Sequence, residues 1–161
     1  MDIILQEIKK TDNNTLFHLF QLFSYDISEF NGKDVESDGC YHGYDVSEYT
    51  TNSSYISYFI KENDKIAGFA VVRIEDDLTY LRHFFILRKF RKMGIGIKAA
   101  FMIFDMCKNK FRVSTMDFNK PAIEFWRKVC NRYTGGCYNE IRRDDDKGPQ
   151  FEFNTGPKKW L

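Results

Sequence analysis

The segment RKFRKMGIG, residues 88–96, places four basic side chains directly before two glycines, Gly94 and Gly96. Apolar residues then recur at helical spacing, so a helix is expected from Ile97 onward. Glycine lets a backbone approach a ligand closely, and the first N–H groups of a helix are a ready site for an anion. The pattern therefore predicts a loop that binds a diphosphate. Its basic residues are Arg88, Lys89, Arg91 and Lys92.

Two other interpretations of the glycines compete with this one. Gly94, Gly96 and Ala99 satisfy the dinucleotide pattern G-x-G-x-x-G/A, and Asp117 follows about 20 residues later. In a dinucleotide fold, however, the apolar strand runs straight into the first glycine, whereas the charged residues 88–93 intervene here. An isolated charge run can also be no more than a solvated turn before a helix.

Hydrophobic periodicity predicts strands and helices within a single domain, residues 1–161. Apolar residues recur every three or four positions in residues 16–30, 97–107 and 122–129, which favours helices. Runs of β-branched and aromatic residues predict strands at residues 3–8, 54–60, 65–74, 78–87, 111–118, 137–141 and 150–153. Short polar turns favour antiparallel pairing, and the long helical crossover at 97–107 favours one parallel pair.

The composition limits the classes of function. Lys and Arg number 24 and Asp and Glu 23, a net charge of +1, so no overall field would attract nucleic acid or a membrane surface. No stretch approaches the roughly 20 apolar residues that span a bilayer, and a cytoplasmic protein is expected. The four cysteines form no CxxC pair and the three histidines are scattered, so neither a metal site nor a disulfide framework is predicted.

A second motif decides between the interpretations of the glycine loop. Strand, basic loop, glycines and helix are followed by the segment NKPAIEFW, residues 119–126. The two motifs in this order resemble the GNAT superfamily of N-acetyltransferases. The matching positions are Arg91, Gly94, Gly96, Asn119, Ala122, Phe125 and Trp126. The element order matches that fold from Ile3 to Phe153, nearly the whole chain.

The resemblance implies an α/β (α+β) GNAT fold with about seven strands and about four helices. Its central sheet is mixed and mostly antiparallel, and it is splayed between the fourth and fifth strands. Acetyl-CoA is implied as the cosubstrate in that gap, with no metal. The fourth strand would hold the pantetheine arm as if it were an added strand, and the glycine loop would hold the diphosphate. The cofactor-binding residues implied are Phe85, Ile86, Leu87, Arg91, Lys92, Met93, Gly94, Ile95, Gly96, Ile97, Asn119, Phe125 and Trp126.

The family's reaction is direct attack of an amine on a thioester. An ammonium must lose a proton near pKa 10 and a leaving thiolate gains one near 8.5. We expect a backbone N–H near Phe85 or Ile86 to stabilise the developing oxyanion. His83 is the candidate general base, because its reference pKa is about 6.5 and its strand approaches the thioester. Glu29, Asp117 or a chain of waters are alternatives, and His83 can instead be a satisfied core residue.

The general acid is open. The family often provides a tyrosine one residue after the aromatic at Phe125, but this sequence has Trp126 there, and an indole cannot deliver that proton. Tyr133 is the candidate substitute and Tyr138 a second, although packing would explain each. Water can also protonate the thiolate.

Acidic and aromatic residues mark the expected acceptor side. Seven acids lie between Asp26 and Glu48 against one base, Lys33, and four tyrosines are interleaved. Such a rim suits a cationic amine, so a primary amine on a small molecule or a peptide is expected as the acceptor. A soluble loop that balances the basic half is the plainer explanation. The substrate-binding candidates are Tyr25, Asp26 and Glu29.

Two rival functions remain. Trp126 favours a non-catalytic acyl-CoA-binding regulator that kept the cleft and lost turnover. A nucleic-acid module based on residues 88–92 conflicts with the net charge and with the absence of aromatics clustered on one strand. The oligomeric state, including a homodimer, is open.

Overall fold

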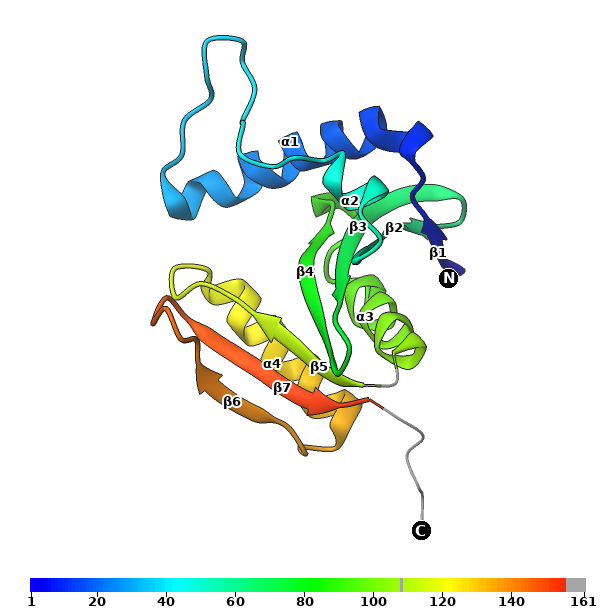
Figure 1. The fold of residues 1–161 in the computed structure, drawn as a ribbon, viewed down its shortest axis with the longest axis vertical. Coiled ribbons are helices and arrows are strands. Elements are labelled where there is room, and N and C mark those ends of the chain that lie inside the picture. Colours follow the sequence, from blue (N-terminus) through cyan, green and yellow to red (C-terminus); the bar gives the residue numbers. More distant parts are fainter. Residues whose placement is uncertain (108, 156–161) are drawn as a thin grey trace.

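Seven strands form one sheet, in the order β1-β2-β3-β4-β5-β7-β6, in a computed structural model that describes residues 1–107 and 109–155 (Figure 1). The strands are β1 (Ile3–Glu7), β2 (Tyr55–Glu62), β3 (Lys65–Ile74), β4 (Leu78–Ile86), β5 (Lys110–Ser114), β6 (Asn139–Arg142) and β7 (Pro149–Asn154). The helices are α1 (Asn13–Asn31), α2 (Glu48–Thr51), α3 (Ile95–Met106) and α4 (Lys120–Thr134), with short turns of 3-10 helix at Lys10–Asp12 and Arg88–Phe90. Residues 156–161, the end of the predicted domain, lie outside the described part.

The pairing of β4 with β5 creates the gap that the sequence predicted. Among the strand pairs, β4–β5 is parallel and the others are antiparallel. The β4–β5 register runs from Leu78 opposite Lys110 to Leu81 opposite Val113 and then stops. Beyond Leu81 the two strands diverge, as Figure 1 shows. The mostly antiparallel sheet with a splay between the fourth and fifth strands is therefore confirmed.

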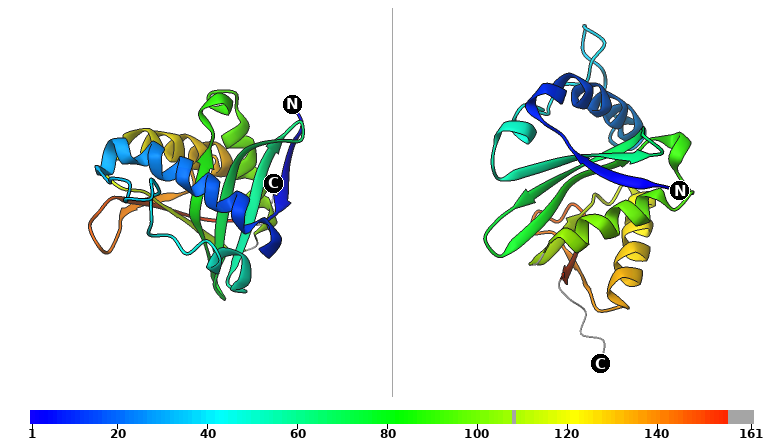
Figure 2. Two further views of the ribbon diagram at one scale, coloured as in Figure 1. Left: turned by 90° about the horizontal axis from the view of Figure 1, so that it is seen from above. Right: turned by 90° about the vertical axis from the view of Figure 1, so that its right-hand side faces the viewer.

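Helices cover both faces of the sheet (Figure 2). On one face, α1 and α2 pack through an aromatic-rich cluster that contains Phe20, Tyr49 and Phe69. On the other face, α3 and α4 pack through a larger cluster that includes Phe104 and Val129. Burying two apolar faces of one sheet is the arrangement that stabilises a mixed α/β domain. The two clusters meet at β4, whose side chains point alternately into each.

A bulge in β4 changes which side chains point into which cluster. Val72 pairs with Leu81 and Val71 with His83, so Arg82 is the extra residue on β4. A bulge adds one residue to one strand and re-aims the side chains beside it. Leu81 therefore points into the α3/α4 cluster, whereas His83 faces the rings of α1. Strict alternation along the strand would have put both on one face.

Two predicted boundaries are wrong in detail. α3 begins at Ile95, two residues before the expected Ile97, because Gly94 adopts a left-handed conformation with φ of 81° and begins the helix directly. β5 ends at Ser114, although the apolar pattern of the strand continued to Phe118. After Ser114 the chain runs toward α4, so Thr115, Met116 and Phe118 line the gap instead of lengthening the strand.

Candidate active site

A cleft of about 140 Å³ opens where β4 and β5 diverge. It is lined from α1, from the bulged half of β4, from the segment after β5 and from the start of α4. The lining residues are Phe23, Ile27, Leu81, Arg82, His83, Phe84, Val113, Ser114, Thr115, Met116, Phe118, Asn119, Ala122 and Trp126. The structure therefore brings together His83, Asn119 and Trp126, three of the residues that the sequence predicted.

The amino end of α3 forms a cradle of unpaired backbone donors, which we call the α3 cradle and define as residues 94–97. The first bond along the helix is from the Lys98 N–H to the Gly94 carbonyl, 3.0 Å. The N–H groups of residues 95–97 therefore have no acceptor within the helix. A Cβ added at Gly94 would have no atom within 4 Å and would project into open space. An anionic group of a ligand can thus reach the helix end.

Gly96 is needed for packing more than for ligand approach. A Cβ at Gly96 would lie 3.2 Å from the Phe125 ring, tighter than ordinary van der Waals contact. Phe125 in turn stacks on Phe84 at 6.0 Å between ring centroids, and Trp126 meets Phe84 edge-on at 5.2 Å. The two glycines of the motif therefore differ in role. Gly94 keeps the cradle open, and Gly96 lets α4 approach α3.

The backbone of β4 presents only part of the predicted pantetheine-binding segment to the cleft. The Leu87 N–H donates to the Ala67 carbonyl at 2.8 Å, so Leu87 faces β3. Hydrogen-bonded and non-bonded pairs alternate in an antiparallel ladder, so Phe85 opposite Phe69 also faces β3. Phe84 and Ile86 consequently turn their N–H groups toward the gap. Of the three predicted residues, Ile86 is thus the one whose N–H faces the gap, whereas the N–H groups of Phe85 and Leu87 face β3, and Phe84 is added to Ile86.

The basic residues before the cradle are held by α1. Asp26 accepts a hydrogen bond from Arg88 Nε at 2.8 Å and another from Arg91 Nη2 at 2.7 Å. Arg91 Nε also donates to the Ile86 carbonyl at 2.8 Å. Burial alone would raise the pKa of Asp26, but the hydrogen bonds from Arg91 and Arg88 outweigh it and the pKa is lowered. Because arginines occupy both carboxylate oxygens, the predicted role of Asp26 in binding the acceptor is not favoured.

Replacing Asp26 with asparagine is expected to lower the free energy of unfolding at pH 7 by at most about 1 kcal/mol, because both arginines are exposed. The folded-state pKa lies below the ordinary value of 3.8, so this stabilisation is present above that value and is lost as the pH falls through the folded pKa. Urea unfolding at pH 7 and pH 3 measures both effects. Glu29→Gln, on the same helix and without an ion pair in the described chain, is the control.

His83 is buried and neutral. Its side chain is 9% exposed, its Nε2 lies 3.0 Å from the Tyr49 hydroxyl, and the rings of Phe20, Phe23 and Tyr44 surround it. Burial, together with the charge of Arg82, lowers the pKa of His83 to about 3. An imidazole with so low a pKa is a poor acceptor for the proton of an ammonium. The predicted general-base role is therefore not favoured, although His83 does line the cleft.

Tyr133 lies at the wrong end of α4 to act in the cleft. Its hydroxyl donates to Asp105 Oδ1 at 2.8 Å, and its ring packs on Phe104 and Phe153. Asn119 lies at the start of the same helix, and a rise of 1.5 Å per residue separates the two ends by about 20 Å. The predicted role of Tyr133 as general acid is thus not favoured, and Tyr138 likewise packs on Phe151.

The remaining candidates have simple surroundings. Asn119 is the N-cap of α4, where its Oδ1 accepts from the Ala122 N–H at 3.2 Å, and it also lines the cleft. Tyr25 is 65% exposed on α1 and Glu29 is exposed one turn further on. Asp117, an alternative base, is bound by Arg142 at 2.8 Å outside the cleft. Lys92 and Met93 are exposed beside the α3 cradle.

Sequence reasoning missed Arg82 as part of the site, and it did not foresee that Tyr44 and Tyr49, two tyrosines of the expected aromatic rim, pack on His83. Arg82 lines the cleft and lies beside the Tyr49 hydroxyl. Burial raises the pKa of both tyrosines, so they stay protonated. The available signal was a charged residue in the middle of an otherwise apolar strand. The bulge that turns Arg82 into the cleft leaves no such trace in the sequence.

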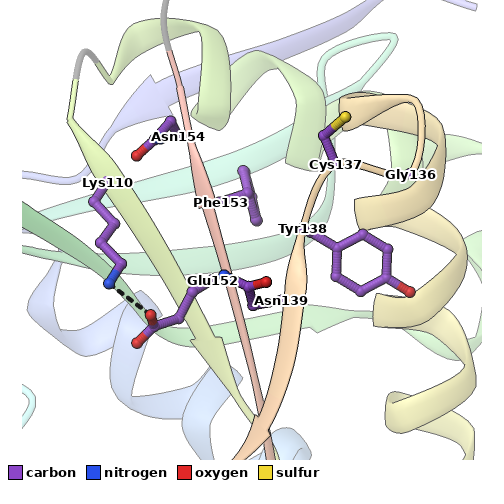
Figure 3. Close-up of a pocket in the computed structure, with 8 residues that line it drawn as sticks. All are labelled: Lys110, Gly136, Cys137, Tyr138, Asn139, Glu152, Phe153 and Asn154. Atoms are coloured by element: carbon purple, nitrogen blue, oxygen red, sulfur yellow. Dashed lines mark ion pairs between the residues drawn. The ribbon is translucent and has the colours of Figure 1, made fainter.

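Two larger hollows lie away from these residues. The one in Figure 3, about 440 Å³, is lined from β5, β7 and the turn after α4. The charged pair in it, Lys110 Nζ and Glu152 Oε2, is satisfied at 2.6 Å. The second, about 360 Å³, is lined by ion-paired residues such as Arg127 and Glu140. Apart from the secondary candidates Tyr138 and Asp117, neither contains a predicted site residue, so size does not identify the site here.

No group of three or more His, Cys, Asp or Glu side chains that could hold a metal is found in the described residues. Within the same residues, no helix is long and apolar enough to cross a membrane.

Comparison with known proteins identifies the family of this chain. The model of the acetyltransferase (GNAT) family matches residues 17–131. Comparison with curated protein sequences gives no match. A GNAT acetyltransferase from Staphylococcus aureus is 20% identical with a TM-score of 0.67, covering 96% of this chain and 99% of that one.

Two further solved structures share the fold. The ribosomal-protein-S18-alanine N-acetyltransferase from Escherichia coli is 13% identical with a TM-score of 0.62, covering 99% of each chain. Aminoglycoside acetyltransferase AAC(6')-Ib in complex with coenzyme A is 14% identical with a TM-score of 0.64, covering 95% of each chain.

Proposed function

The chain belongs to the GNAT family of acetyltransferases, and we propose that it transfers the acetyl group of acetyl-CoA to a primary amine of a small molecule or peptide. The observation that carries the proposal is the cleft between β4 and β5 together with the α3 cradle beside it. The described residues fit the coenzyme, because unpaired amides and an open Gly94 would receive its diphosphate. The solved relative that contains coenzyme A supports the same assignment.

The proposed cosubstrate supplies an acetyl group that is activated as a thioester. The residues of the α3 cradle would hold the diphosphate by backbone donation, and Lys92 would add charge. Along β4, Phe84 and Ile86 would offer their outward N–H groups to the pantetheine arm and the thioester oxygen. Trp126 would exclude water from the opposite wall, since its ring is buried against Phe84.

Proton transfer would depend on solvent more than on a side chain. No carboxylate is among the residues that line the cleft in the described chain, and His83 is a weak base. The amine would therefore lose its proton to water before it attacks. A leaving thiolate needs little help from an acid near neutral pH, so the absence of a tyrosine at Trp126 is compatible with turnover.

The test is direct. Calorimetry measures acetyl-CoA binding, and a thiol-release assay follows turnover with polyamines, aminoglycosides, amino acids and short peptides. We expect micromolar binding and thiol release with one class of amine. Failure to bind acetyl-CoA would contradict the assignment, whereas binding without thiol release from any amine would favour a non-catalytic regulator. Trp126 at the family's tyrosine position is the observation that keeps this second candidate.

A further inference from the structure

The charge in the cleft is positive, opposite in sign to that of the acidic loop at residues 26–48. The sign of this charge indicates which kind of acceptor the proposed reaction would use. Among the 14 residues that line the cleft, Arg82 carries a charge, and His83, the other ionisable residue, is neutral. The acids at 26–48 do not reach the cleft lining. Asp26 is bound to arginines, Asp38 pairs with His42 at 2.7 Å, and Asp45 accepts from Ser47. An acidic wall for a polycation is therefore missing from the described site.

Arg82 and Arg132 are the arginines without an ion pair to a carboxylate in the described residues, and of these two Arg82 lines the cleft. Seven others form ion pairs with Asp or Glu: Arg73, Arg88, Arg91, Arg112, Arg127, Arg142 and Arg143. Within the described residues, no ion pair joins Arg82 to an acid. Its neighbours are instead the Tyr49 hydroxyl, Tyr44 and His83. Arg82 is exposed at the cleft, and a guanidinium beside aromatic rings and away from carboxylates is a site for an anionic group.

Arg82 lies close to the place where the proposed reaction would occur. The bulge makes Arg82 the extra residue of β4, two positions before Phe84, whose N–H faces the gap. A group bound by Arg82 would therefore lie within a few bonds of an amine that attacks beside Phe84. The cleft volume of about 140 Å³ leaves room for a small side chain or a chain end. One arginine with no second cation in the lining matches a single negative charge better than a phosphate.

We propose, on the basis of the acetyltransferase function above, that Arg82 binds a carboxylate of the acceptor, which is thus a small amino acid with its amine close to its carboxylate. The planar guanidinium can take both carboxylate oxygens and fix the direction of the amine. Phe23 and Phe84, which line the cleft, would cover the remaining side of the acceptor with aromatic surface. This assignment replaces the cationic amine that the acidic loop alone suggested.

The experiment compares amino acids with their own amides, which differ only in the carboxylate. Thiol release is measured for small amino acids, the matching amides and spermidine, with wild type, Arg82→Gln and Arg82→Lys. Wild type is expected to prefer the acid over its amide at least tenfold in kcat/KM. Arg82→Gln should lose that preference through KM, and Arg82→Lys should keep part of it. Arg73→Gln, on the neighbouring strand and paired with Glu75, is the matched control and should leave the preference unchanged.

Several outcomes would overturn the carboxylate site without touching the coenzyme site. One is equal or better turnover of amides or spermidine, and another is an unchanged preference in Arg82→Gln. If no amine is turned over, calorimetry of the coenzyme-loaded protein decides. Amino acid binding that weakens at least tenfold in Arg82→Gln supports the site, and no binding overturns it. The acetyl-CoA affinity is measured in parallel, because its loss in wild type would instead reject the proposed function.

Discussion

Glutamate in place of Gly94 is expected to weaken acetyl-CoA binding by about 100-fold or more. Gly94 begins α3, and its missing side chain leaves open space in front of the α3 cradle. A carboxylate there would project toward the place proposed for the diphosphate, and like charges held together cost several kcal/mol. Each 1.4 kcal/mol is about tenfold in affinity, so even a partial repulsion gives this loss. Calorimetric titration with acetyl-CoA measures it.

Two variants separate charge from backbone strain. Gly94 has φ of 81°, a conformation that costs a side chain about 1 kcal/mol, so Gly94→Ala carries the strain without the charge. Gly135→Glu puts the same charge at a left-handed glycine with open surroundings at the far end of α4. Both should bind acetyl-CoA nearly as wild type does. An affinity for acetyl-CoA in Gly94→Glu equal to that of Gly94→Ala would refute the cradle as the diphosphate site.

Acidification from pH 7 to pH 5 is expected to lower the free energy of unfolding by about 2 kcal/mol through His83 alone. Its folded-state pKa is about 3, whereas the unfolded value is 6.5, so between these values only the unfolded chain binds the proton. The stability is therefore full above pH 6.5 and is lost as the pH falls below it. The lowered pKa values of Asp26 and Glu152 act as the pH falls below the ordinary carboxyl values of 3.8 and 4.5, which lie outside this window.

The control for this prediction is a histidine with the opposite surroundings. His83→Gln should remove the loss between pH 7 and pH 5, because glutamine does not titrate. His42→Gln should keep it, since His42 is exposed and pairs with Asp38. Urea unfolding at several pH values measures both. A wild-type stability that is flat from pH 7 to pH 5 would mean that His83 is accessible to protons, and its role as a base would return.

Much of the fold could be predicted because the periodicity of hydrophobic residues within short segments indicates each helix and strand. Local patterns predict the conformation of several elements: the apolar stripe of α1, the strand runs of β2 to β4 and the glycine before α3. The order of the elements then fixed the parallel β4–β5 pair, since a helical crossover of that length returns the chain in the same direction. The boundaries at Ile95 and Ser114 were missed because they depend on how neighbouring elements pack.

The sequence predicted only those parts of the candidate site that a single short segment forms by itself. Residues 94–97 and 119–126 carry their motifs in the sequence, and they determined the family and the expected cofactor side. The charges and proton-transfer groups were decided by tertiary structure. Asp26 meets Arg88 and Arg91 from a distant helix, a bulge turns Arg82 into the cleft, and burial makes His83 neutral. Partners far apart in the chain set these properties, so no local pattern could reveal them.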